Sequence, residues 1–368
     1  MTATTSTVTA TDDSAPGAGP VPRRPVVRVA GGRVALRLHV RGIAVGGLLA
    51  ATALVVAVLA LSTGELPVPP TDVLASLTGR ADAGTDFVVR ELRLPRVLAG
   101  LFVGAALGLS GAIFQSLTRN PLGSPDLVGL TLGASTGALV VILVLDGSGP
   151  AVAAGAVGGC VATAAAVWLL AFRRGGQTYR LILMGVGIAA LLEALNSFLI
   201  VRARLDEALS ARVWLIGSLN SRTWTDVAIV GVALGLLLPV ALRYGGRLRM
   251  LSVGDELAAL LGVPVGRTRA VLAGVGVVLA AAATAAAGPV GFVALAAPQL
   301  AARLTRSPGA GLLPAAAMGA LLLVASDWVA QRALTDVQLP VGVVTGALGG
   351  TYLTWLLARE WRRGRTVG

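Results

Sequence analysis

Two adjacent carboxylates, Asp255 and Glu256, stand in the stretch SVGDELAALLGVPVGRTR at residues 252–269. Ser252 lies three residues before Asp255, which is the spacing of a capping box, so we expect a helix to begin at residue 253. Both acids would fall in the first turn of that helix, where the helix dipole favours negative charge. The stretch therefore places both acids at the start of a helix, in a segment that is too short and too polar to cross a membrane.

The same stretch also predicts where this helix ends. Gly262 can take the left-handed conformation that closes a helix, and Pro264 prevents continuation, which leaves about two turns. Leu257, Leu260 and Leu261 share one face. Because two turns are not stable alone in water, the helix must pack on something. It either rests on its own chain or serves as a docking helix for a cytoplasmic partner.

An ionisable residue also stands deep in an apolar run, in LLEALNSF around Glu193. An intramembrane carboxylate is a functional hypothesis by default, here a proton or cation site. The alternative is an interhelical contact, with Asn196 three residues on as its partner. The sequence leaves both interpretations open.

A pair of cations, Arg93 and Arg96 in RLPR, precedes another apolar run. Their side chains could snorkel from the end of a helix to the membrane surface. Alternatively, they form a cationic site for an acidic partner outside the cell membrane.

Several kinds of chemistry are excluded by composition. All 30 basic residues are Arg, so the chain lacks the Lys that a P-loop requires, and a partner must hydrolyse any ATP that drives it. The single Cys160 and the single His39 lie far apart, which excludes an internal disulfide, a Cys/His nucleophile pair and a common zinc site. We therefore expect no catalytic residues, no metal and no cofactor bound by this chain.

The elements that position these residues are membrane spans. The chain is 55% hydrophobic and 13% charged, as expected for a polytopic, all-α membrane protein. Aromatic residues are scarce and the Arg residues lie at the ends of apolar runs, so the basic charge indicates membrane orientation and not nucleic-acid binding. We expect ten spans: 43–61, 97–117, 127–145, 151–172, 181–201, 227–242, 270–287, 289–302, 311–330 and 341–358, the eighth being short and interrupted by Pro298.

The Arg distribution predicts the orientation of these spans. With both termini in the cytoplasm, 21 of the 30 Arg lie on the cytoplasmic side, in agreement with the positive-inside rule. Residues 1–40 are expected to form a disordered Arg-rich tail, 41–360 the transmembrane domain and 361–368 a second cytoplasmic tail. On the outer side, the segment 202–226 contains the run ARVWLIGSLNSRTW (211–224), which predicts a short amphipathic helix with Trp214 and Trp224 at the headgroup level.

Together these stretches resemble the FecCD family, the permease subunits of ATP-driven importers for ferric siderophores, haem and cobalamin. The resemblance extends from about residue 41 to 360 and is carried by six motifs in the family's order. These motifs are RLPRVLAGLFVGAALGLSGAIFQ (93–115), RNPL with PDLVGLTLGAS (119–135), WLIGSL (214–219), GDELAALLG (254–262), GPVGFVALAAPQLAARL (288–304) and LPVGVVTGALGG (339–350).

The resemblance implies a BtuC-like type II importer permease in which two subunits, identical or different, enclose a pathway. It implies that residues 254–262 form the coupling helix, seated in a separate ATPase subunit that binds ATP and Mg²⁺. It implies that Arg93 and Arg96 pair with acids of an extracytoplasmic binding protein. Pathway or gate residues would come from the fifth span and the helix after it; they are Glu193, Asn196, Trp214, Gly217 and Ser218.

Three positions depart from the family's pattern. Where the family has a third docking Arg, this chain has Gln331, and Arg332 follows it as a substitute docking contact. Gln338 replaces a common Glu, which removes an acid at the outer face. Gln299 replaces a common His, which keeps a polar group but removes a titratable one.

The sequence thus predicts the permease of a ferric-siderophore importer in the cytoplasmic membrane, working by alternating access. The sequences of its motifs are most similar to those of enterobactin-type siderophore permeases. Haem and cobalamin are the other cargoes of the family. The alternative from another class is an ion-coupled secondary transporter that uses Glu193.

Overall fold

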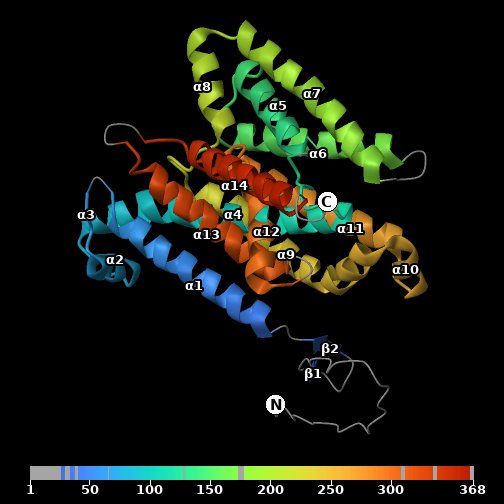
Figure 1. Cartoon of the computed structure of the whole chain (residues 1–368). Helices are drawn as coiled ribbons and strands as arrows, with labels where there is room; N and C mark the ends of the chain where they lie inside the picture. The colour runs from blue at the N-terminus through green and yellow to red at the C-terminus, as the bar shows by residue number, and fades with distance from the viewer. Residues whose placement is uncertain are drawn as a thin grey trace.

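The computed structural model describes residues 26–29, 34–37, 40–64, 66–126, 129–172, 178–307, 311–334 and 338–364. Ten of its helices occupy the ten predicted spans, which confirms the all-α membrane fold (Figure 1). They are α1 (Val40–Ser62), α4 (Leu94–Thr118), α5 (Leu130–Leu143), α6 (Pro150–Phe172), α7 (Thr178–Arg202), α9 (Trp224–Val253), α11 (Val265–Ala287), α12 (Val293–Thr305), α13 (Leu312–Ala330) and α14 (Val341–Gly364).

These ten helices differ in length. Among the described residues, seven helices are long and apolar enough to cross a membrane: those over Arg41–Ser62, Ala83–Thr118, Pro150–Leu170, Leu183–Arg202, Trp224–Val253, Val265–Ala287 and Leu312–Ala330. α5 has 14 residues and α12 has 13, so each rises only about 20 Å, against a hydrocarbon core of about 30 Å. Pro298 lies inside α12, as expected for the interrupted span.

Shorter helices lie at the ends of the spans. α2 (Pro70–Leu77), α3 (Ala83–Asp86) and a π-helical segment (Phe87–Arg93) connect α1 to α4. α8 (Leu205–Ile216) follows α7 and covers only the first part of the amphipathic helix predicted at 211–224, because the helix begins earlier and ends before Gly217. α10 (Asp255–Leu260) follows α9.

A two-stranded antiparallel hairpin, β1 (Val26–Val29) with β2 (Val34–Arg37), precedes the helices. Its register pairs Val26 with Arg37 and Val29 with Val34. Both strands contain β-branched Val, which favours extended pairing. The disordered tail over 1–40 stays a prediction, because most of that segment lies outside the described residues.

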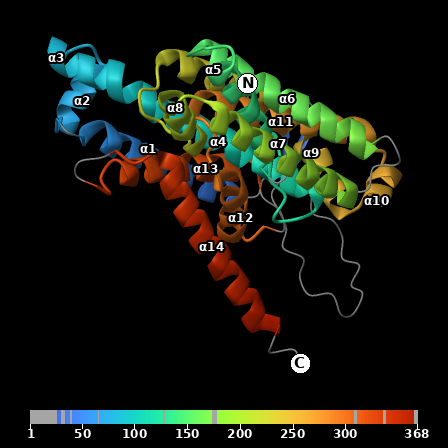
Figure 2. The same ribbon diagram turned by 90° about the horizontal axis from the view of Figure 1, so that it is seen from above.

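The spans define two opposite faces of the molecule. Nε of Arg41 donates a hydrogen bond to the carbonyl of Leu304 at 3.2 Å, so the start of α1 lies beside the end of α12. The end of α4 and α10 lie at this same end, which we call the α10 face. The end of α1, α2, α3 and the start of α4 lie at the other end, which we call the α2 face (Figure 2).

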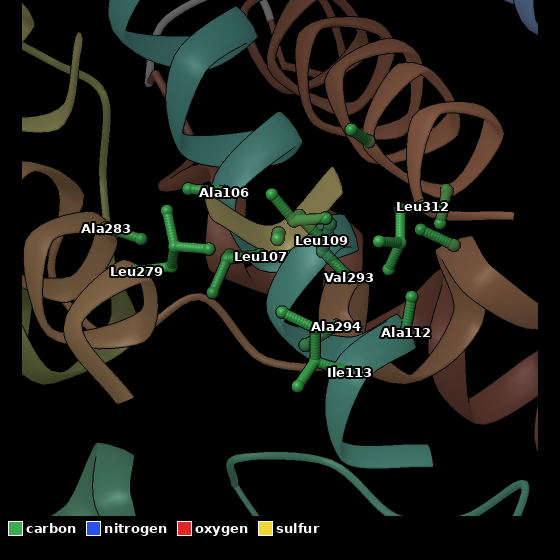
Figure 3. Close-up of a cluster of buried hydrophobic side chains, with 14 of the residues drawn as sticks. Ala106, Leu107, Leu109, Ala112, Ile113, Leu279, Ala283, Val293, Ala294 and Leu312 are labelled. Atoms are coloured by element: carbon green, nitrogen blue, oxygen red, sulfur yellow. The ribbon is translucent and has the colours of Figure 1, made fainter. Parts of the chain in front are cut away.

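α4 is the central helix of the bundle. It packs against α9, α11, α12 and α13, and most of its side chains are buried. Figure 3 shows Leu107, Leu109 and Ile113 of α4 among side chains from the neighbouring helices, including Leu279 and Val293. The sites at both faces are therefore built on the two ends of one closely packed helix.

Glycines allow α4 and α13 to approach backbone to backbone. A Cβ atom at Gly104 would overlap the carbonyl of Gly319, and one at Gly319 would overlap the carbonyl of Gly104. α5 and α6 meet in the same way at Gly137 and Gly155. Small residues at such positions bring membrane helices into close van der Waals contact, which is a main source of their association.

Candidate functional site

The start of the predicted docking helix differs from the sequence expectation. α9 continues well past residue 242, where its span was expected to end, and reaches Val253. The hydroxyl of Ser252 donates to the carbonyl of Arg249 at 2.8 Å, inside α9, so the predicted capping box does not form. Gly254 separates the two helices at φ +153° and ψ +148°, a conformation open to Gly and strained for other residues, and α10 begins at Asp255.

The end of α10 is as predicted. Gly262 takes φ +79°, and its N–H donates to the carbonyl of Ala259 at 2.9 Å. The N–H of Val263 donates to the carbonyl of Ala258 at 3.0 Å. These two hydrogen bonds form a Schellman motif, and the buried side chains of Ala258 and Val263 supply its usual apolar contact. The helix is thus short, closed at its end and anchored by two small side chains.

Leu257 and Leu260 of α10 and Leu261 at its C-cap face away from the described chain. Leu257 is 49% exposed, Leu261 is 63% exposed and Leu260 is 84% exposed. In water, such an arrangement leaves apolar area uncovered at the tip of a polar loop, which is typical of an interaction surface. The geometry favours a docking helix over a helix that rests its leucines on its own chain.

The adjacent acids of α10 have different surroundings. One oxygen of Asp255, Oδ1, lies 2.6 Å from Nη2 of Arg119, which directly follows α4. Nη2 of Arg269 in α11 lies 3.0 Å from that oxygen and 2.9 Å from Oδ2. Glu256 is exposed. Asp255 therefore attaches α10 to its own chain, while Glu256 lies on the outside with the leucines.

At the α2 face, Arg96 lies in an internal network. Its Nε and Nη2 donate to the two carboxylate oxygens of Asp327 at 2.9 and 2.8 Å, and its Nη1 donates to Oε1 of Gln338 at 3.1 Å. Gln331 donates to the same carboxylate at 2.8 Å. The side chains of the ion pair are 13% and 5% exposed. The network ties α4 to α13 and to the segment before α14, so sequence analysis missed Asp327 as the partner of Arg96.

Arg93 and Arg332 lie at the rim of that network. Arg93 donates to the carbonyl of Leu61 at 2.7 Å and also to the carbonyl of Leu66. Arg332 is exposed, and its guanidinium lies 4.5 Å from the centre of the Trp328 ring. Partial burial lowers the pKa of Arg332 and the nearby carboxylate of Asp327 opposes that shift, but a guanidinium stays charged at neutral pH.

Glu193 and Asn196 of α7 differ in burial. The side chain of Glu193 is exposed on the outside of the described chain. Asn196 is buried, and its Oδ1 accepts a hydrogen bond from the hydroxyl of Thr136 in α5 at 2.7 Å. Asn196 thus makes an interhelical contact, but with Thr136 and not with Glu193.

The predicted gate residues at the end of α8 contact residues of two other motifs, those at 288–304 and 339–350. Gly217 takes φ +77°, and its carbonyl accepts a hydrogen bond from Gly342 at 3.1 Å. The N–H of Ser218 donates to the carbonyl of Ala287 at 2.8 Å. A Cβ at Gly288 would lie 2.8 Å from the carbonyl of Trp214. The structure therefore joins the ends of α8 and α11 with the start of α14 at one tight junction.

Gln299, which departs from the family's pattern, links three segments of the α10 face. Its Nε2 donates to the carbonyl of Pro121 at 2.7 Å, and its Oε1 accepts from the hydroxyl of Tyr352 at 3.1 Å. Across the described ranges, no three His, Cys, Asp or Glu side chains come together as a metal site would need.

Comparisons with known proteins agree with this architecture. The model of the FecCD transport family matches residues 39–359. The chain is 46% identical over 316 residues to the ferric enterobactin transport system permease protein FepG of Escherichia coli, covering 86% of this chain and 96% of that protein. It is 34% identical over 318 residues to the Fe(3+)-citrate import system permease protein YfmE of Bacillus subtilis, covering 86% and 95%. A solved metal-chelate type ABC transporter in an inward-facing conformation is 29% identical with a TM-score of 0.77, covering 86% of this chain and 99% of that one.

Proposed function

Because the chain belongs to the FecCD transport family, we propose that it is the membrane permease subunit of an ATP-driven importer for ferric siderophores. The observation that carries the proposal is α10, a closed two-turn helix that exposes three leucines beside Glu256. Because a chain without Lys has no P-loop, a separate ATPase subunit must hydrolyse the ATP that drives transport. α10 is the place where that subunit would bind.

The relatives support the class of substrate. Two of them are a ferric enterobactin transport permease and an Fe(3+)-citrate import permease, and both proteins are matched over nearly their full length. Both cargoes are ferric iron held by an organic chelator. The higher identity to the enterobactin relative favours a siderophore of that type as the cargo of this chain.

The route through the protein requires further partners. Windows of α7 and α9 are 11% and 17% buried, which leaves apolar surface for lipid and for a second permease subunit. The two subunits would enclose a pathway that opens alternately to each side of the membrane. The junction at Gly217 and Ser218 would change position when the pathway opens and closes. On the α2 face, the exposed Arg332 would contact an acidic extracytoplasmic binding protein, and the α10 face with both chain termini would lie in the cytoplasm.

The test is transport in proteoliposomes that contain the assembled importer, with ferric enterobactin as the probe. We expect uptake that requires ATP on the ATPase side and the binding protein on the other side. Uptake driven by an ion gradient without ATP would refute the proposal. That result would instead support the ion-coupled alternative, in which Glu193 is the coupling site.

A further inference from the structure

α10 needs an attachment that its own sequence does not supply. No side chain caps its start, where Gly254 is the N-cap, and its six residues bury chiefly the small Ala258. A helix of this length does not hold its position without tertiary contacts. A force applied to the exposed leucines would rotate it unless a second contact resisted the rotation.

The carboxylate of Asp255 makes that second contact with two different spans. Arg119 approaches from the end of α4 at 2.6 Å, and Arg269 approaches from the second turn of α11 at 2.9 Å. Because the two guanidinium groups come from separate helices, they fix the carboxylate in more than one direction. α4 and α11 are themselves packed together, through Leu107 and Leu279 among others (Figure 3).

The backbone of Arg119 supports a specific use of its side chain. Arg119 follows α4 at φ +50° and ψ +33°, the left-handed conformation in which Gly is ordinarily favoured at the end of a helix. Its N–H closes α4 on the carbonyl of Gln115. Gly would serve this backbone better, so the presence of Arg indicates that its guanidinium, held on Asp255, matters.

We infer that Arg119 and Arg269 are positioning residues, which hold the docking helix α10 on α4 and α11 through Asp255. This inference rests on the proposed function, because it assigns the route by which movement of an ATPase subunit would enter the bundle. α4 and α11 would receive that movement first, and the other end of α4 carries the Arg96 network of the α2 face. Glu256, exposed beside the leucines, has no part in this attachment.

The variants that test the inference are Arg119→Gly, Arg269→Gln and Asp255→Asn. Arg119→Gly keeps the left-handed backbone at no steric cost and removes the guanidinium alone. The matched controls are Arg249→Gln and Arg267→Gln, two exposed arginines of α9 and α11 that take no part in this attachment. Partly exposed ion pairs contribute little to overall stability, so all five variants should insert and assemble with the ATPase subunit.

The measured quantity is ferric enterobactin taken up per ATP hydrolysed, in proteoliposomes with the complete importer. We expect this ratio to fall about 2- to 30-fold in the three test variants, the range found when residues that transmit coupling are changed. It should stay at the wild-type value in both controls. The double variant Arg119→Gly with Asp255→Asn should be no worse than Asp255→Asn alone, because both changes break the same contact.

The outcomes separate the inference from the proposed function. If the wild-type importer takes up ferric enterobactin with ATP, and the test variants keep its uptake per ATP, Arg119 and Arg269 are not positioning residues. If the double variant adds the losses of the single variants, Arg119 does not act through Asp255. A wild-type importer that shows no ATP-dependent uptake would instead overturn the proposed function itself.

Discussion

Replacing Asp327 by Ala should destabilise the protein more than any single change at the exposed arginines. The substitution leaves Arg96, whose side chain is 13% exposed, without the carboxylate that accepts two of its hydrogen bonds. It also leaves Gln331 without its acceptor. Removing one partner of a largely buried ion pair costs about 3–5 kcal/mol, because the remaining charge stays away from water. Residual pairing of Arg96 with Gln338 places the expected loss near the lower end of that range.

The single cysteine of the chain provides the assay. Cys160 is 1% exposed, so a thiol-reactive dye labels it when the bundle opens. Labelling against denaturant concentration, in detergent, gives the free energy of unfolding by linear extrapolation. Arg332→Gln is the matched control, since an exposed charge contributes about 0–1 kcal/mol.

A double variant separates charge from packing. Arg96→Leu combined with Asp327→Leu removes both charges together, and a buried pair replaced by apolar side chains is often neutral in stability. We therefore expect the double variant to recover most of the stability that Asp327→Ala loses. If Asp327→Ala lost no more than Arg332→Gln, the network would not hold the α2 face together and this reasoning would be refuted.

Four further changes test other parts of the structure. Leu260→Ser should leave stability within about 0.5 kcal/mol because the side chain is 84% exposed, while binding of the ATPase subunit, measured by titration, should weaken by about 1.5–3 kcal/mol. Gly319→Leu should cost about 1–3 kcal/mol or more by thiol labelling, because its side chain would overlap Gly104. Glu193→Gln should leave ATP-driven uptake unchanged, whereas the ion-coupled alternative requires its loss. Arg332→Glu should slow capture of the binding protein in stopped-flow measurements, and the effect should fade as salt rises.

Local signals in the sequence were sufficient for the end of α10 but not for its start. Gly262 and Pro264 act within a few residues, so the Schellman turn could be predicted from them alone. Ser252 failed as a cap because α9 continues through it, and its hydroxyl turns back to a carbonyl inside that helix. Whether a Ser caps the next helix or bonds within the preceding one depends on where the preceding helix ends, and the tertiary packing of α9 decides that.

The charged networks required contacts between distant parts of the chain. The sequence marked Arg96 as a cation at a helix end, which is correct, but Asp327 lies 231 residues away along the chain. Nothing in the spacing of either residue indicates the other. The departures at Gln331 and Gln338 were visible in the sequence, and the structure shows their common feature, since both belong to the network of Arg96.

The division between buried and exposed spans was beyond sequence reasoning for a physical reason. The spans of α4 and α9 have almost the same hydropathy, yet 78% of the α4 window and 17% of the α9 window are buried in the structure. In a water-soluble protein, buried helices are more apolar than exposed ones. Because lipid is as apolar as the protein interior, the hydropathy of a membrane helix does not indicate whether the helix is central. The distinguishing signal is size: α4 carries Gly104, Gly108 and Gly111 at spacings that let α12 and α13 approach its backbone. Glycine spacing therefore indicates where helix backbones meet, as it also does between α5 and α6, whereas hydropathy does not.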